Sequence, residues 1–254
     1  MSTEPRRDSL TDPGPTKHAA DSTARTIAFV LYPGLTLFDL VGPLQVLTAL
    51  TQTVPAYRTV VVAERVEPMD TDIPGTMKVV PNATFAEVPD PFAFIVPGGV
   101  MPTLRAMRNP AIRTYVRRAA ETAEVVGSVC TGALILASVG LLEGRQATTH
   151  WAFSSVLEQL GATYVRRRWV EDGRFICSAG VSAGIDMALQ LAARLTDQHH
   201  ARDVQHRLGY DPEPPFGALD YDNIRGQLGA WRRGVRLAAP VIAARPKRLT
   251  RHGR

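Results

Sequence analysis

The sequence has few cysteines, no long apolar run, and no acidic residue in its last 30 positions. Its 254 residues include two cysteines, Cys130 and Cys177, which are too few for the disulfide framework of a secreted protein. No apolar stretch approaches the ~20 residues that span a bilayer, and the N-terminus lacks the basic and then apolar order of a signal peptide. We therefore expect a globular, cytoplasmic protein with reduced thiols and no membrane partner.

Phosphate-binding and metal-binding motifs are also missing. Neither G-x-G-x-x-G nor G-x-x-x-x-G-K-[ST] occurs, so no nucleotide-type phosphate loop is expected. His199, His200 and His206 lack the i, i+4 spacing that places two histidines beside one metal ion on a helix. The sequence thus predicts no metal site and no required cofactor.

The formal net charge of +5 originates at the C-terminus. Residues 225–254 contain nine lysines and arginines and no acid, whereas residues 1–25 hold four residues of each sign. The body between them, residues 26–224, therefore carries a net charge of −4. No aromatic residues interleave with the basic tail at 245–254, so we interpret the tail as a solvated end and expect no nucleic-acid partner.

Alternating strand and helix patterns follow an aperiodic start. Residues 1–24 are rich in Pro, Thr, Ser, Asp and Arg, which indicates a disordered leader. Strands are expected at 26–32, 57–63, 92–96, 125–129, 145–150, 164–170 and 174–179, with an accessory pair near 76–81; helices are expected at 35–50, 109–123, 131–140, 152–160, 184–195 and 197–208, before a final arginine-rich helix. This order predicts an α/β fold with a mostly parallel sheet and helices on both faces.

One predicted strand ends abruptly at Cys130. The apolar run 125–129 stops at this cysteine, and Thr131-Gly132 leads into an Ala/Leu/Ile segment of helical composition. A thiolate at such a strand–turn–helix junction faces the positive end of the helix, which favours a nucleophilic role. The alternative is a small apolar residue that ends a buried strand, since free cysteine is among the most buried residue types.

Two further features follow predicted strands at their carboxyl ends, where parallel sheets bind ligands. Gly98-Gly99 has no Cβ atoms to block a ligand from its backbone N–H groups. Asp39 lies in an apolar context, where a carboxylate is unfavourable unless paired, although it could simply cap the following helix. If Asp39 meets Cys130, the two acids share one proton and titrate as a pair.

The roles of two other residues stay open at this stage. His150 ends the predicted strand 145–150 and either orients the cysteine or is a polar core residue. Cys177 lies in the middle of a predicted strand, a position more typical of packing than of a resolving thiol.

Five stretches together resemble the ThiJ/PfpI superfamily, whose domain is a flavodoxin-like sandwich similar to class I glutamine amidotransferases. They are Leu37-Phe-Asp-Leu-Val-Gly-Pro43, Val96-Pro-Gly-Gly99, Ser128-Val-Cys-Thr-Gly132, Ala147-Thr-Thr-His-Trp151 and Ser178-Ala-Gly-Val-Ser-Ala-Gly-Ile-Asp186. Within the superfamily the match is closest to the isonitrile (isocyanide) hydratases, whose Tyr-x-Pro-x-Pro-Pro-Phe segment is similar to Tyr210-Asp-Pro-Glu-Pro-Pro-Phe216. A glycine often follows the Gly-Gly pair in the superfamily, whereas this chain has Val100.

The resemblance implies a role for each residue that matches a motif. Cys130 would be the nucleophile on a nucleophile elbow, Asp39 its carboxylic-acid partner, and Thr131 a donor through its backbone N–H. The substrate would contact Gly98, Gly99, Val181 and His150. The resemblance also implies a homodimer, and it places the ThiJ/PfpI-like domain at residues 25–220, before a basic helix and tail at 221–254.

Two functions are compatible with these residues. Peptidases and deglycases of the superfamily tend to carry His directly after the cysteine, where this chain has Thr131, and glutamine amidotransferases need a late His-x-Glu that is missing here. The first function, implied by the resemblance to the isonitrile hydratases, is a hydro-lyase that adds water to isonitriles, which are small electrophilic substrates, and gives N-substituted formamides through a thioimidate on Cys130. The alternative is a non-catalytic ligand- or redox-sensing domain related to the sensor half of AraC-type regulators, although the ~35 residues after Phe216 are too few for their two DNA-binding motifs.

Overall fold

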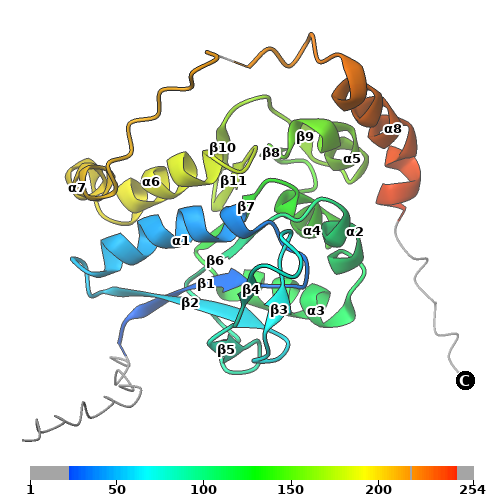
Figure 1. The fold of residues 1–254 in the computed structure, drawn as a ribbon. Coiled ribbons are helices and arrows are strands. Elements are labelled where there is room, and N and C mark those ends of the chain that lie inside the picture. The colour runs from blue at the N-terminus through cyan, green and yellow to red at the C-terminus, as the bar shows by residue number, and fades with distance from the viewer. Residues whose placement is uncertain (1–22, 218, 245–254) are drawn as a thin grey trace, which may run out of the picture.

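The computed structural model describes residues 23–217 and 219–244 and confirms the mostly parallel sheet covered by helices (Figure 1). The predicted leader, apart from its last two residues, and the basic tail at 245–254 lie outside the described residues. Seven strands form the sheet in the order β10-β11-β7-β6-β1-β2-β5, and β10 alone among them runs antiparallel to its neighbour. They are β1 (Arg25–Val30), β2 (Tyr57–Ala63), β5 (Ala83–Thr84), β6 (Ala93–Val96), β7 (Val125–Val129), β10 (Trp169–Asp172) and β11 (Phe175–Ser178).

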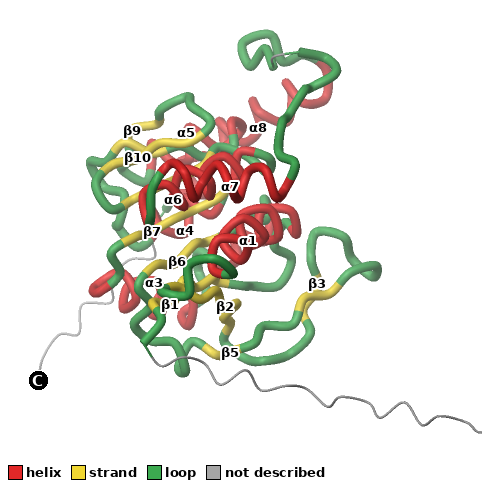
Figure 2. Tube along the Cα trace, turned by 90° about the vertical axis from the view of Figure 1, so that its left-hand side faces the viewer, coloured by secondary structure: helices red, strands yellow, loops and turns green. Residues whose placement is uncertain are grey.

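Helices cover both faces of this sheet. On one face lie α1 (Leu37–Thr51), α6 (Ala183–Leu195) and α7 (Gln198–Leu208), side by side in both views (Figures 1 and 2). On the other lie α2 (Met101–Ala106), α3 (Pro110–Thr122) and α4 (Gly132–Ser138). The arginine-rich C-terminal helix is confirmed as α8 (Gly226–Ala243), which packs on the 3₁₀ turn η1 (Trp151–Phe153) and on α5 (Ser154–Gln159).

Local sequence explains two of the confirmed boundaries. Asn109 caps α3, because its side chain accepts the N–H groups of Ala111 at 2.8 Å and Ile112 at 3.2 Å, and Pro110 fills the first helical position. Gly173, with a φ of 62°, closes the predicted hairpin between β10 and β11.

Several shorter elements differ from the prediction. The expected strand 145–150 shrinks to β8 (Gln146–Ala147), which pairs with β9 (Thr163–Tyr164) outside the main sheet. The expected strand 164–170 is split between β9 and β10. The three arginines 166–168 between them are exposed and belong to no strand. The accessory pair consists of β3 (Met69–Asp70) and β4 (Lys78–Val79).

Two elements were missed altogether, α2 and β5. The helix α2 has six residues, of which Thr103 and Ala106 are buried. This is too short and too polar a segment to show the apolar periodicity of a helix. β5 has two residues, too few for the alternation that marks a strand.

The sheet order brings three loops to one edge. β1 and β6 are adjacent although β2 follows β1 in the chain, so the strand order reverses between β1 and β6. The loops after β1, β6 and β7 therefore leave neighbouring parallel strands at the same end, where such sheets bind ligands. The first two loops are bonded directly, since the Thr36 N–H donates to the Gly98 carbonyl at 2.8 Å.

Gly132, the first residue of α4, packs against the end of β6. A Cβ atom here would overlap the Val96 carbonyl oxygen, which is backbone and has no freedom to move aside. We expect Gly132→Ala to lower the free energy of unfolding by about 3 kcal/mol. Gly234 in α8 has open space around its Cβ position, so Gly234→Ala should raise this free energy by about 0.5–1 kcal/mol. Urea unfolding measures both changes. An unchanged free energy of unfolding in Gly132→Ala would contradict the close packing of Gly132 against β6.

Candidate active site

Cys130 forms a strained turn between β7 and α4. Its φ is 56°, in the left-handed region that residues other than glycine rarely adopt. The Cys130 N–H donates to the Ser178 carbonyl at 2.9 Å, and the Cys130 carbonyl accepts the Thr149 hydroxyl at 2.9 Å. These two bonds hold the backbone on both sides of the turn. The elbow geometry expected from the sequence is thus present, while the nucleophilic role stays a prediction.

Asp39 lies in the first turn of α1 and is fully buried. Its Oδ2 accepts the Gly98 N–H at 3.0 Å, so the alternative that Asp39 caps its own helix is wrong. Its Oδ1 has no hydrogen bond of ordinary geometry among the described residues. A Cβ on residue 98 would lie 2.6 Å from Oδ2, so a glycine is needed at this position.

The two acids are electrostatically coupled. Burial raises the pKa of Asp39 from its usual 3.8 to about 7, against the opposing effects of the Gly98 N–H and of the nearby Cys130 thiol. Burial, and after it the charge of Asp39, also raises the pKa of Cys130 well above its usual value, although the Thr131 N–H opposes this shift. Near neutral pH the pair therefore keeps a proton on sulfur beside a carboxyl that is about half ionised. A proton shared by the two acids leaves either a thiolate beside a protonated carboxyl or a thiol beside a carboxylate, and the two shifts favour the thiol.

Thr131 joins the elbow to the loop after β6. Its Oγ1 accepts the Gly99 N–H at 3.0 Å and the Val100 N–H at 3.1 Å. The N–H groups of Gly98 and Gly99 are thus bonded within the chain, and the expectation that they are free to meet a ligand is wrong. Val100, which stands where the superfamily often has glycine, has a φ of 49°, and its bond to Thr131 helps to hold this unusual conformation.

A chain of buried hydroxyl groups continues from Thr131. Thr103 Oγ1 lies 2.8 Å from Thr131 Oγ1 and 3.0 Å from Tyr32 Oη, and Tyr32 donates to the Pro97 carbonyl at 2.9 Å. Because two N–H groups already occupy the lone pairs of Thr131, its own proton points to Thr103, which in turn donates to Tyr32. Neither Tyr32 nor Thr103 was predicted as a site residue, since Tyr32 ends an apolar run and Thr103 lies in α2, which has no sequence signal.

A cavity of about 590 Å³ lies beside the elbow. Several of its lining residues are next in sequence to Asp39 or to the residues bonded to Cys130: Phe38 precedes Asp39, His150 follows Thr149, and the segment 179–183 follows Ser178. Val181 and His150, predicted as substrate contacts, line this cavity, whereas Cys130, Asp39, Gly98 and Gly99 are not among its lining residues.

His150 is a neutral ring packed among aromatic side chains. Burial lowers its pKa from 6.5 to about 4. Its Nδ1 accepts the Ala152 N–H at 3.4 Å, and its ring centroid lies 5.1 Å from that of Trp151 and 5.8 Å from that of Trp231. No hydrogen bond to Cys130 is found in the described part of the chain. The geometry therefore favours the polar core residue over the group that orients the cysteine.

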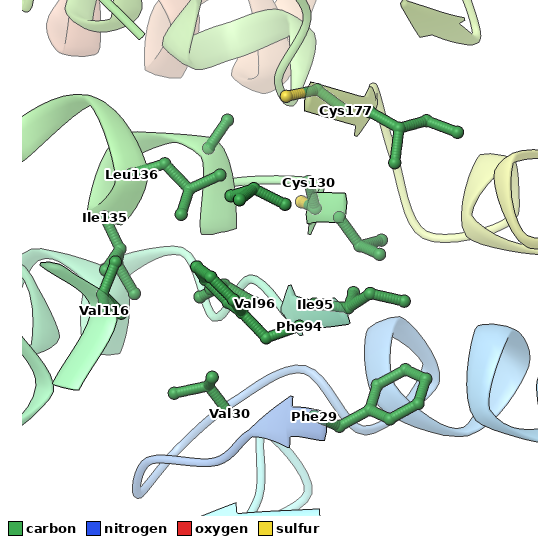
Figure 3. Close-up of a cluster of buried hydrophobic side chains, with 14 of the residues drawn as sticks. Phe29, Val30, Phe94, Ile95, Val96, Val116, Cys130, Ile135, Leu136 and Cys177 are labelled. Carbon is green, nitrogen blue, oxygen red and sulfur yellow. The ribbon is translucent and has the colours of Figure 1, made fainter. Parts of the chain in front are cut away.

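Cys177 is a packed thiol. It lies on β11, next to β7, among the apolar side chains of the core (Figure 3). Burial raises its pKa to about 11, so it is protonated at physiological pH. This agrees with the packing role predicted from its position in the middle of a strand.

Within residues 23–217 and 219–244, no group of three or more His, Cys, Asp or Glu side chains is arranged to hold a metal ion. Over the same residues, no helix is long and apolar enough to cross a membrane.

The bonds to Thr131 Oγ1 predict a stability difference between two variants of this residue. Thr131→Val leaves the Gly99 and Val100 N–H groups buried without an acceptor, so we expect the free energy of unfolding to fall by roughly 2–4 kcal/mol. Thr131→Ser keeps the oxygen and should lose about 1 kcal/mol, for the missing methyl group. Equal values for the two variants in urea unfolding would show that the hydroxyl does not hold the loop.

The raised pKa of Asp39 predicts a pH-dependent cost of folding. Because the carboxyl binds its proton more tightly in the folded state, its ionisation reduces stability as the pH rises from about 4 to about 7. Asp39→Asn keeps an acceptor for the Gly98 N–H and removes this ionisation. We expect the variant to gain stability over the wild type at pH 8 and little at pH 4, in urea unfolding. The exposed Asp211→Asn serves as the control, and a gain for Asp39→Asn that does not change with pH would contradict the shift.

The chain matches known proteins along most of its length. The DJ-1/PfpI family matches residues 25–194, which is more than half of the chain. An isonitrile hydratase of Pseudomonas putida is 39% identical over 224 residues, covering 87% of this chain and 93% of that protein. A ThiJ/PfpI family protein from Pseudomonas syringae has a solved structure that superimposes with a TM-score of 0.76, at 31% identity, over 93% of this chain and 98% of the other.

Part of the chain is also similar to a transcriptional regulator. The regulator CdhR of Pseudomonas aeruginosa is 38% identical over 105 residues, which cover 40% of this chain and 30% of the regulator. This match spans less than half of either protein, whereas the family match includes the elbow, the Asp39 helix and the loop after β6. The chain therefore belongs to the DJ-1/PfpI family, also called the ThiJ/PfpI family.

Proposed function

We propose that the protein is an isonitrile hydratase in which Cys130 is the nucleophile and Asp39 moves the proton. The observation that carries this proposal is the buried Cys130–Asp39 pair, a thiol on a strained turn beside a carboxyl whose pKa is about 7. The substrate class is supported by the 39% identity to a protein named isonitrile hydratase over most of both chains.

The first half of the reaction uses one proton of the pair. As Cys130 Sγ attacks the terminal carbon of the isonitrile, the thiol proton passes to the Asp39 carboxylate, and negative charge develops on that carbon. Asp39 then gives the proton to the carbon, which forms a thioimidate, R–N=CH–S–Cys130. The otherwise unbonded Oδ1 of Asp39 is the oxygen available for this transfer.

The second half of the reaction uses water. Water adds to the thioimidate carbon, one of its protons goes to the substrate nitrogen, and the other passes through Asp39 to the departing sulfur. The C–S bond breaks, and the N-substituted formamide leaves with the thiol restored. Thr131 stabilises the sulfur through its backbone N–H whenever negative charge develops there.

This mechanism predicts which side chains formamide production needs. Cys130→Ser and Cys130→Ala should abolish turnover, and Asp39→Asn should lower kcat/KM at least about 100-fold, the usual size of a lost general acid. The matched control is Cys177→Ala, which removes the second buried thiol and should keep the wild-type rate. Formamide is measured by chromatography, and formamide production by Cys130→Ala would contradict the mechanism.

The pH profile provides a separate test of the shared proton. Below about pH 7 the Asp39 carboxylate is protonated, so the pair holds two protons and Asp39 can no longer accept the one on sulfur. The value of kcat/KM should therefore fall as the pH decreases. The residual activity of Asp39→Asn should lack this acidic limb. A wild-type rate that is flat from pH 5 to pH 8 would exclude Asp39 as the proton acceptor.

The second candidate, a ligand-sensing domain without turnover, is favoured by the partial match to CdhR. It predicts tight binding of an isonitrile with no formamide formed, so the same assay separates the two functions. A homodimer, implied by the resemblance to the superfamily, also stays a proposal, and sedimentation velocity would test it.

A further inference from the structure

The wall of the cavity beside the elbow contains positively charged side chains that have no role in the proposed hydration reaction. Three consecutive arginines contribute to its wall. Arg166 donates to Asp222 at 2.6 Å, and Arg168 donates through Nε to Asp186 at 2.6 Å. Arg167, which is exposed, forms no ion pair with any acidic residue of the described chain.

The other acidic residue of the cavity wall, Asp220, is hydrogen-bonded within its own turn and forms no ion pair with Arg167. Asp220 accepts the N–H groups of Asp222 and Asn223 at 3.0 and 3.2 Å and the Asn223 amide at 2.6 Å, which ties it to its own turn. With Asp222 and Asp186 each held by another arginine, the guanidinium of Arg167 is the positive charge in this wall that is left for a ligand.

The position of Arg167 relative to the elbow is set by a short bonded path. The Arg167 carbonyl accepts the hydroxyl of Thr148 at 3.3 Å, and the next residue, Thr149, holds the carbonyl of Cys130. The main chain of Arg167 is therefore anchored close to the strand end that carries the thiol.

The rest of the cavity wall is largely aromatic and apolar. The rings of Trp151 and Tyr221 have centroids 6.4 Å apart, and Tyr164, Phe38 and Leu219 add further apolar surface. A space of about 590 Å³ is far larger than an isonitrile group of two atoms, and it is within the range of cavities that bind ring-containing small molecules.

We propose that this cavity binds the N-substituent of the substrate, and that the substituent is a ring-sized apolar group ending in a carboxylate held by Arg167. The proposal rests on the proposed function, since it places the reacting isonitrile carbon at Cys130. A guanidinium and a carboxylate form two parallel charge-assisted hydrogen bonds, so the acid fixes the orientation of the ring as well as its affinity.

The test compares two substrates that differ in one charge, 4-isocyanobenzoate and its methyl ester. The wild type should have a kcat/KM roughly tenfold higher for the acid, the size of one partly exposed charge-assisted hydrogen bond. Arg167→Gln should remove this preference, by lowering kcat/KM for the acid roughly tenfold. The matched control is Arg117→Gln, an exposed arginine of α3 outside the cavity, which should keep the preference. Added salt should reduce the wild-type preference, because Arg167 is exposed to solvent.

A binding measurement separates the failure of this inference from the failure of the proposed function. In Cys130→Ala, 4-formamidobenzoate and its methyl ester are titrated while tryptophan fluorescence is recorded, with and without Arg167→Gln. Binding of the acid that depends on Arg167 supports the cavity assignment even if no isonitrile is hydrated. Equal handling of acid and ester, or a preference that survives in Arg167→Gln, would overturn it.

Discussion

A carboxyl and a thiol buried side by side set the main constraint on this structure. Asp39 and Cys130 are both buried, so each charge is unfavourable, and the two together are more unfavourable still. The arrangement is stable when one proton is shared between them. The shared proton also suits the proposed chemistry, because a proton that moves easily between sulfur and oxygen can be delivered to a substrate carbon.

The surrounding residues make this unfavourable pair possible. Gly98 lets the backbone come within hydrogen-bond distance of Asp39, and Gly132 lets α4 begin directly against β6. Thr131 satisfies two buried N–H groups of the adjacent loop. Part of the stability of the fold is thus used to hold a strained turn at Cys130 and a carboxyl with a raised pKa, a common feature of sites that carry chemistry.

The fold class and the turn at Cys130 were predictable from the sequence, because their signals are local. The apolar run before Cys130, the cap at Asn109 and the turn at Gly173 each follow from a few neighbouring residues. The protonation state of Cys130 was not predictable, because it depends on burial, which is a property of the whole packed core. The hydroxyl chain through Thr103 was hidden for a similar reason, since it joins residues that are far apart in the sequence.

Above about pH 7 Asp39 and Cys130 hold one proton between them, and a titration of the Asp39 carboxyl tests this most directly. Aspartate labelled with ¹³C at the side-chain carboxyl, in wild type and in Cys130→Ala, reports the pKa of Asp39 by NMR, with Asp39→Asn assigning the signal. We expect a midpoint at about 7 in the wild type and a higher one in Cys130→Ala, because the thiol lowers the pKa of this carboxyl. A midpoint near the usual 3.8, unchanged when the thiol is removed, would contradict it.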